Sequence, residues 1–212
     1  MNGKPGRYIV IEGIDGAGKT TQANRLRQQL EQRGKEVEQT HEPGGTPIGE
    51  AIRSILKNAD LARTNQSDFE LFTIARRELA AQAIGPWLLA GKAVISDRNW
   101  FSSYVYQGCA EPGGTAEERF KAKQRIMRHS REALGALFRP EAVILDLPVG
   151  LMRRRLASRR GTDYFELKGN DYFERVREGY LELAQSLVLP VVDASQSADA
   201  VQADVVLALR LD

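Results

Sequence analysis

Short continuous apolar runs alternate along this chain with apolar residues at helical spacing. Residues 8–11 form one such run, and beyond a glycine-rich turn Ala23, Leu26 and Leu30 share one helical face. A continuous run is typical of a strand buried on both sides, and spacing of three to four residues is typical of a helix packed on such a strand. The chain is therefore predicted to begin with a buried strand and an amphipathic helix.

The same alternation continues to the C-terminal end. Strands are predicted near residues 8–11, 37–40, 93–96, 142–147 and 191–193, with helical patterns between and after them. Alternating strands and helices predict a parallel sheet covered by helices on both faces. We expect one α/β domain spanning residues 1–212, built on a doubly wound five-stranded parallel sheet that binds ligands at the carboxyl ends of its strands.

Two residues bear on where helices bend or begin. Pro86 falls inside a long helical pattern and is expected to kink that helix or mark its final turns. Asn170 precedes the pattern of Phe173, Val176 and Tyr180 and is expected to cap a late helix.

The turn between the first strand and the first helix is glycine-rich. Residues 13–20 read Gly-Ile-Asp-Gly-Ala-Gly-Lys-Thr, the phosphate-binding pattern G-x-x-x-x-G-K-T in its required context. Backbone N–H groups and the helix N-terminus favour phosphate there, so Lys19 is expected to reach the β/γ-phosphates and Thr20 to hold Mg²⁺. A plain glycine turn is the alternative, and the flanking elements make it the weaker one. The predicted nucleotide-binding residues are Gly13, Ile14, Asp15, Gly16, Ala17, Gly18, Lys19, Thr20 and Thr21.

Composition narrows the class of protein. Hydrophobic residues make up 42% of the chain and the formal net charge is +2, so no broad basic surface indicates nucleic acid or an anionic membrane as a partner. Cys109 is the single cysteine, which rules out an internal disulfide and fits a reducing compartment. No segment approaches the roughly 18 apolar residues of a membrane helix. We expect a soluble, cytoplasmic enzyme with a small-molecule substrate.

Charged residues follow several predicted strands at the edge where ligands bind. Glu42 follows the second strand, and Asp97 and Arg98 end the third. We interpret Asp97-Arg98 as functional, because the carboxylate can act on a metal and the guanidinium can hold phosphate oxygens in a bidentate pair. Asp146 ends the fourth strand just before a proline, and there a structural role is favoured.

For other candidate site residues, the sequence pattern alone leaves both a structural and a functional role open. Phe72 and Arg76 lie four residues apart on one helical face, where they could stack on a nucleobase and bond its edge. Core packing and a surface ion pair are the favoured interpretation of that pair, and a polar helix turn is the favoured one for residues 102–107. The basic cluster between residues 153 and 160 could be a solvated face, a weak nucleic-acid patch, or a lid that brings arginines to a transferred phosphoryl group.

Taken together, the motifs resemble the bacterial thymidylate kinases over nearly the full length of the chain. The resemblance rests on residues 11–22, Glu42-Pro43-Gly44-Gly45-Thr46, Asp97-Arg98, Ser102-Ser103 with Tyr106-Gln107-Gly108, and Val192-Asp193-Ala194-Ser195. It implies a P-loop kinase fold with ATP and Mg²⁺ at the P-loop, dTMP in the adjoining cleft, and a homodimer packed through helices.

The resemblance also assigns roles to single residues and reverses the interpretation of Phe72 and Arg76. Phe72 matches the ring that stacks on thymine, and Arg76 matches the guanidinium on the base edge. Tyr106 matches the aromatic residue against the deoxyribose, and Arg98 matches the arginine on the 5′-phosphate. Asp15 matches a carboxylate near the 3′-hydroxyl and the metal. The implied acceptor site is Asp15, Glu42, Phe72, Arg76, Arg98, Ser102, Ser103, Tyr106 and Gln107, and the implied metal ligands are Thr20 and Asp97.

The family divides by the position of its catalytic arginine. Gly16 and Ala17 occupy the P-loop stretch where one branch carries it, so this chain resembles the branch that supplies it from a lid, here about residues 153–168. Residues 163–166 read Asp-Tyr-Phe-Glu and lack the arginine that the family commonly has there, which moves the expected role toward Arg159 and Arg160. The expected catalytic residues are Lys19, Asp15, Arg98, Arg159 and Arg160.

We therefore expect Mg²⁺·ATP-dependent phosphorylation of dTMP to dTDP. One alternative is another deoxynucleotide or deoxynucleoside kinase of the same fold. Another is a P-loop module that binds ATP as a switch and transfers no phosphate. The charge of the acceptor distinguishes a dTMP kinase from a nucleoside kinase. Arg98 and a basic lid can bind an acceptor phosphate, whereas an uncharged nucleoside gives them nothing to neutralise.

Overall fold

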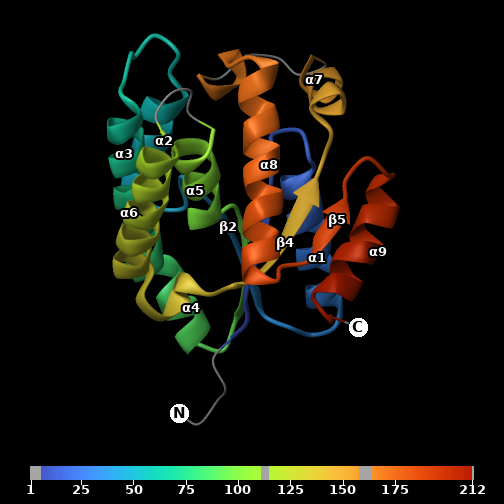
Figure 1. The fold of residues 1–212 in the computed structure, drawn as a ribbon. Helices are drawn as coiled ribbons and strands as arrows, with labels where there is room; N and C mark the ends of the chain where they lie inside the picture. Colours follow the sequence, from blue (N-terminus) through green and yellow to red (C-terminus); the bar gives the residue numbers. More distant parts are fainter. Residues whose placement is uncertain (1–5, 111–114, 158–163, 212) are drawn as a thin grey trace.

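The computed structural model describes residues 6–110, 115–157 and 164–211 (Figure 1). Its first half contains β1 Tyr8–Gly13, α1 Lys19–Gln32, β2 Val37–His41, α2 Pro47–Lys57, α3 Asn65–Leu79, the π-helix η1 Ala80–Ile84, α4 Gly85–Leu89, β3 Ala93–Asp97 and α5 Trp100–Gly108. Its second half contains α6 Ala116–Leu134, η2 Gly135–Phe138, β4 Glu141–Asp146, α7 Val149–Ala157, η3 Phe165–Leu167, α8 Asn170–Leu187, β5 Val191–Asp193 and α9 Ala198–Ala208.

The five strands form one parallel sheet in the order β2-β3-β1-β4-β5. Ile11 of β1 pairs with Asp97 of β3 on one side, and Gly13 pairs with Leu145 of β4 on the other. This register brings the carboxyl ends of the three central strands to one edge. The prediction of a doubly wound five-stranded parallel sheet is confirmed.

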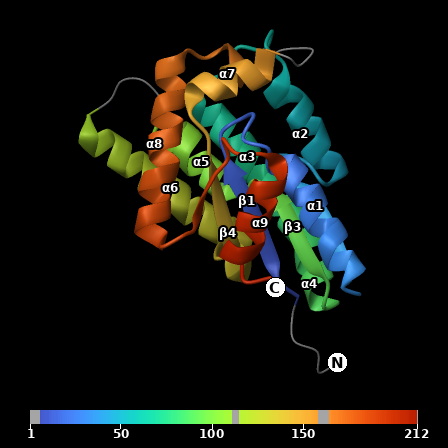
Figure 2. The same cartoon turned by 90° about the vertical axis from the view of Figure 1, so that its right-hand side faces the viewer.

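Helices cover both faces of this sheet (Figures 1 and 2). α1 and α9 pack together on one face, and α5 packs against α3 and α8 on the other. Ile9, Val10 and Ile11 of β1 are completely buried, as is Leu26 of α1. A central strand buried on both sides must be apolar at successive positions, which is why residues 8–11 do not alternate. None of the helices in the described ranges is long and apolar enough to cross a membrane.

One local expectation is confirmed and one is wrong. Pro86 marks the final turns of its long helical run, because the chain passes from α3 through the π-helix η1 into α4, which carries Pro86 in its first turn and ends at Leu89. A missing N–H is tolerated in a first turn, where the group has no partner within the helix. Gly169, and not Asn170, is the N-cap of α8, and the Asn170 amide oxygen accepts from Arg153 Nε at 2.9 Å.

Replacing Leu26 with alanine is expected to lower the free energy of unfolding by about 2–5 kcal/mol, because it leaves a cavity between α1 and the sheet. Urea unfolding measures this change. Gln28→Ala, at an exposed position of the same helix, is the control and should change stability by less than about 0.5 kcal/mol. Equal losses in the two variants would contradict the placement of α1 against the core.

Candidate active site

A cleft lies at the carboxyl edge of the sheet. Its walls come from the P-loop, the ends of β2 and β3, α2, α3, α5 and the segment after residue 163. The predicted residues that line it are Asp15, Gly16, Gly18, Lys19, Thr20, Thr21, Glu42, Phe72, Asp97, Arg98, Ser102, Ser103, Tyr106 and Gln107. Residues that are far apart in the sequence, and that were predicted separately, thus line one cavity.

The backbone of the P-loop requires its glycines. Gly16 and Gly18 have φ of 76° and 93°, in the left-handed region that side chains with a Cβ rarely occupy. A Cβ on Gly13 would overlap the carbonyl oxygen of Leu145 on the neighbouring strand. The N-terminus of α1 then follows Gly18, so unpaired N–H groups of the first turn point toward the cleft, as phosphate binding needs.

Lys19 lies folded over this loop. Its side chain is buried, and Nζ donates to Ile14 O at 3.0 Å and lies 3.9 Å from the Asp15 carboxylate. Burial lowers the pKa of Lys19, and the charge of Arg98 lowers it further, while nearby carboxylates oppose both effects. The ammonium group therefore lies near a carbonyl oxygen and a carboxylate but is poorly solvated. Poor solvation of this charge favours an anionic ligand beside it.

Thr20 and Asp97 meet at the other side of the P-loop. Thr20 Oγ1 donates to Asp97 Oδ2 at 2.5 Å. One hydroxyl and one carboxylate fit Mg²⁺, which binds few protein oxygens and keeps waters and substrate phosphates as its other ligands. The described residues hold no cluster of three or more His, Cys, Asp or Glu that could form an all-protein metal cage.

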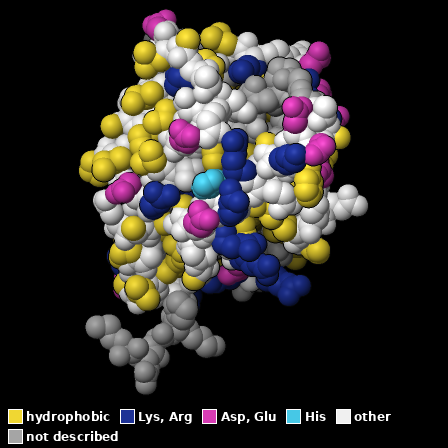
Figure 3. Space-filling model, turned by 60° about the vertical axis from the view of Figure 1, so that its left-hand side comes forward, with side chains coloured by type: hydrophobic (Ala, Val, Ile, Leu, Met, Phe, Trp, Pro, Cys, Tyr) yellow, Lys and Arg dark blue, Asp and Glu magenta, His cyan; other side chains and the backbone are white. Residues whose placement is uncertain are grey.

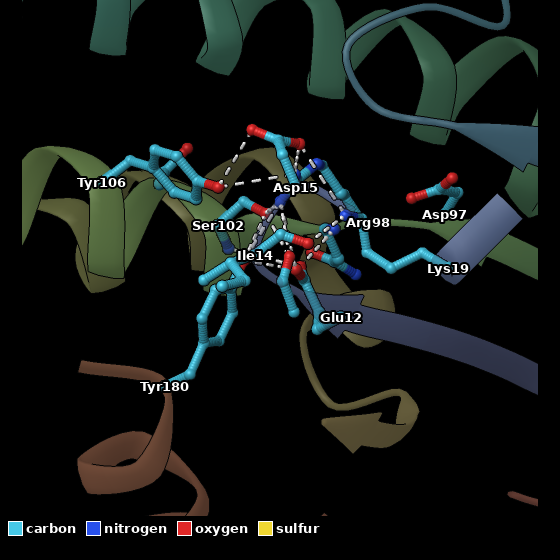
Figure 4. Close-up of polar contacts among 12 residues, drawn as sticks. Glu12, Ile14, Asp15, Lys19, Asp97, Arg98, Ser102, Tyr106 and Tyr180 are labelled. Carbon is cyan, nitrogen blue, oxygen red and sulfur yellow. Dashed lines mark hydrogen bonds and ion pairs between the residues drawn. The ribbon is translucent and has the colours of Figure 1, made fainter. Parts of the chain in front are cut away.

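Arg98 is at the centre of the polar network (Figure 4). Its Nη2 donates to Asp15 Oδ1 at 2.5 Å, and its Nη1 donates to Ser102 Oγ at 2.9 Å and to Tyr180 OH at 3.2 Å. The guanidinium is therefore fixed by the P-loop, α5 and α8 together. Its backbone has φ of 78°, which is uncommon for a residue other than glycine.

Glu12 lies beneath Arg98 and is completely buried. It accepts from the Asn99 backbone N–H at 2.7 Å, from Ser102 Oγ at 2.8 Å and from Tyr180 OH at 2.7 Å. Burial raises the pKa of Glu12, and the charge of Arg98 and these hydrogen bonds partly offset that rise. The carboxylate orients the hydroxyls that also contact Arg98.

Sequence reasoning assigned no role to Glu12 or Tyr180. A charged residue inside the apolar strand β1 was a usable signal for Glu12, because an ionised side chain is rarely buried without a partner. Tyr180 carried no such signal. It lies 82 residues from Arg98 and fits an ordinary apolar helix face.

A buried ion pair of Arg76 and Glu42 lies in the wall of the cleft, where Glu42 is a lining residue and Arg76 stands behind it. Arg76 Nε donates to Glu42 Oε2 at 2.8 Å, and Nη2 donates to Ser103 Oγ at 3.0 Å. Arg76 Nη1, Glu42 Oε1 and Gln107 Oε1 are buried with no hydrogen-bond partner among the described residues. Buried polar atoms of this kind usually have partners, so a polar ligand or a water at this place would complete their hydrogen bonds.

Aromatic rings border this polar group. Phe165 lies between Phe72 and Tyr106, with ring centroids 6.1 and 6.0 Å away. Phe165 lines the cleft but was not among the predicted site residues. No local pattern marked it, because its position depends on the path of the chain after residue 163.

Among the described residues, the arginines of α7 do not form a single group. Arg155 donates to the carbonyl oxygens of Gly16 and Ala194 at 3.0 and 2.8 Å, so it bridges the P-loop and the loop after β5. Arg154 is exposed. Arg159 and Arg160 lie outside the described residues, and their catalytic role stays a prediction.

A phosphate-binding loop after the first strand of a parallel sheet, with a polar and aromatic cleft beside it, defines a P-loop nucleotide kinase. Residues 11–205 match the family model described as thymidylate kinase. The thymidylate kinase of Nitrosospira multiformis is 39% identical over 203 residues, covering 94% of this chain and 95% of that protein. The thymidylate kinase of Chromobacterium violaceum is 36% identical over 208 residues, covering 97% and 94%. The chain belongs to the thymidylate kinase family, which confirms the resemblance.

The carboxyl group of Glu42 gives the site a pH dependence. Burial raises its pKa to about 7, although Arg76 opposes the rise. The unfolded chain has a glutamate pKa of about 4.3, so between about pH 5 and 7 the folded protein binds the extra proton. The free energy of unfolding therefore contains a contribution from Glu42 that is present below this window and is lost as pH rises through it.

Glu42→Gln removes this titration. Urea unfolding at pH 5, 6, 7 and 8 should show the variant gaining stability relative to wild type between pH 5 and 7, with little further change at pH 8. A difference that stays constant from pH 5 to 8 would show that Glu42 is ionised throughout.

Proposed function

We propose that this chain transfers the γ-phosphoryl group of ATP to the 5′-phosphate of dTMP, giving dTDP and ADP. The observation that carries the proposal is the position of Arg98, which pairs with Asp15 of the P-loop and lines the same cleft as Phe72 and Tyr106. A guanidinium there can hold an acceptor phosphate in line with a donor phosphate on the P-loop.

The donor side consists of the P-loop and Lys19. The glycine backbone and the N-terminus of α1 bind the phosphates of ATP, and Lys19 neutralises charge on the β/γ-phosphates. Thr20 and Asp97 would hold Mg²⁺, which neutralises negative charge on the phosphates when it is bound.

The acceptor side consists of Phe72, Arg76, Ser103 and Tyr106. Phe72 stacks on thymine, and the unpaired Nη1 of Arg76 donates to an oxygen on the base edge. Tyr106 lies against the deoxyribose. Its hydroxyl donates to Asp15 Oδ2 at 3.5 Å, so the same residue contacts both the sugar and the P-loop. The buried atoms left unpaired near Arg76 support a polar base over an apolar ligand.

Catalysis by these residues is positioning and charge neutralisation. The transferred group carries charge on its equatorial oxygens, so cations fixed before the reaction stabilise the transition state. Lys19 and Arg98 supply two such charges, Asp15 orients Arg98, and Arg159 and Arg160 are proposed to add charge from the lid.

A deoxynucleoside kinase of the same fold is less well supported. Arg98 is held by ionic and polar partners on three elements, an arrangement with no purpose beside an uncharged hydroxyl. An ATP-binding switch would not need the buried Arg76–Glu42 pair in the adjoining cleft.

The test is ADP release from Mg²⁺·ATP in the presence of dTMP, dUMP, other nucleoside monophosphates, or thymidine. Release with dTMP is expected to exceed release with thymidine by orders of magnitude. Lys19→Ala should lower turnover about 100-fold or more, because it removes a preorganised charge from the phosphoryl group. Lys35→Ala, at an exposed site after α1, is the matched control and should be unaffected. Phosphorylation of thymidine but not dTMP would contradict the proposal.

We also propose that two copies of the chain pair through α3 and α6, within the cytoplasm. These helices pack side by side and leave Ile74 and Phe120 exposed at 44% and 60%. Figure 3 turns the side with α2, α3 and α6 toward the viewer and shows hydrophobic side chains gathered beside a band of Lys and Arg.

Light scattering on the protein as it elutes from a size-exclusion column should give a molar mass of about twice the chain mass of 23.6 kDa. Phe120→Lys is expected to shift the equilibrium toward the single chain, because a charge would have to be buried at the contact. Leu89→Lys is the control, since Leu89 is also exposed, at 83%, but lies on α4. A monomeric wild type would contradict this pairing.

A further inference from the structure

Arg63 is a buried arginine between α2 and α3. Its side chain is 7% exposed, and Nε donates to Asp68 Oδ1 at 2.7 Å. Its terminal nitrogens donate, at 2.8 to 3.1 Å, to the backbone carbonyls of Ile55, Leu56, Asn58 and Leu61. Ile55 and Leu56 lie in the last turn of α2, where helical carbonyls lack the usual partner four residues on. Arg63 therefore fixes the end of α2 against the start of α3.

The ring of Tyr164 lies on the face of this guanidinium. Arg63 Cζ is 4.3 Å from the ring centroid, a distance at which a cation attracts an aromatic face. The backbone N–H of Tyr164 also donates to Lys57 O, the last residue of α2, at 3.4 Å. The segment after residue 163 is thus attached to the end of α2.

Phe165 is carried into the cleft by this attachment. Its ring centroid is 5.2 Å from that of Tyr164 and lies between Phe72 and Tyr106. Leu56 and Lys57, at the end of α2, line the same cleft. Arg63 therefore holds two pieces of the acceptor wall, although it is not itself a lining residue.

We propose that Arg63, through its stack with Tyr164, is a positioning residue that holds Phe165 in the wall of the acceptor cleft. The inference rests on the proposed function for the identity of the acceptor. It makes acceptor binding depend on the stack, whereas donor binding depends on the P-loop, whose described contacts involve neither Arg63 nor Tyr164. The two Michaelis constants should therefore respond differently.

The test compares Tyr164→Leu with Tyr164→Phe in the ADP-release assay. Tyr164→Leu removes the ring and should raise KM for dTMP about 3- to 30-fold, the range expected for a partly desolvated cation–π contact. KM for ATP should stay at the wild-type value, and the thermal midpoint should fall by only about 2–8 °C, because the lost contact is also part of the ligand-free folded state. Tyr164→Phe keeps the ring face on Arg63 and should restore KM for dTMP.

Arg63→Met supplies the second arm, because it keeps the length of the side chain and removes the guanidinium. It should raise KM for dTMP, and Tyr164→Leu added to it should raise KM by less than it does in the wild type, because the Arg63–Tyr164 stack is already lost. If Arg63→Met lowers the thermal midpoint too far for kinetics, the two Tyr164 variants decide alone.

Two results would overturn the proposal: an unchanged KM for dTMP in Tyr164→Leu, or equal rises in both Michaelis constants. The wild type decides the proposed function first. Failure of wild type to phosphorylate dTMP contradicts that function, whereas normal wild-type turnover with an unaffected Tyr164→Leu contradicts only the positioning role.

Discussion

The fixed position of the Arg98 guanidinium is the constraint on which the rest of the site depends. Its partners are Asp15 from the P-loop, Ser102 from α5 and Tyr180 from α8. Its backbone stays in the left-handed region, at a cost of about 1–2 kcal/mol, because these contacts and the buried Glu12 over-determine it. Strain in one residue is thus offset by three elements, and none of them can shift without moving the arginine.

The fold could be predicted to a large extent because its signals are local. A strand buried on both faces must be apolar at successive positions, and residues 8–11 show this directly. Pro86 could be placed in the final turns of its helical run, because proline is itself the local signal. The expectation for Asn170 was wrong, because Arg153 binds the amide oxygen that a cap would have used.

The candidate site also has a part that local sequence signals could predict and a part that they could not. Its P-loop and the Asp97-Arg98 pair could be predicted, since each is a short motif at the end of a buried strand. Phe72 and Arg76 were interpreted as binding residues only through the family resemblance, because their spacing also suits core packing. Tyr180 and Phe165 reach the site only through contacts with residues far away in the sequence. No pattern of residue spacing could therefore predict that they belong to it.

The ion pair of Arg98 and Asp15 has a consequence for how anions enter the cleft. Asp15 is an internal counter-ion, so a phosphate that reaches the guanidinium shares it with a carboxylate. A free inorganic anion gains little from a cation that is already paired, because the carboxylate beside it repels the anion. Selectivity against bare anions then follows from charge balance, and contacts with the base and sugar must supply the remaining free energy of binding.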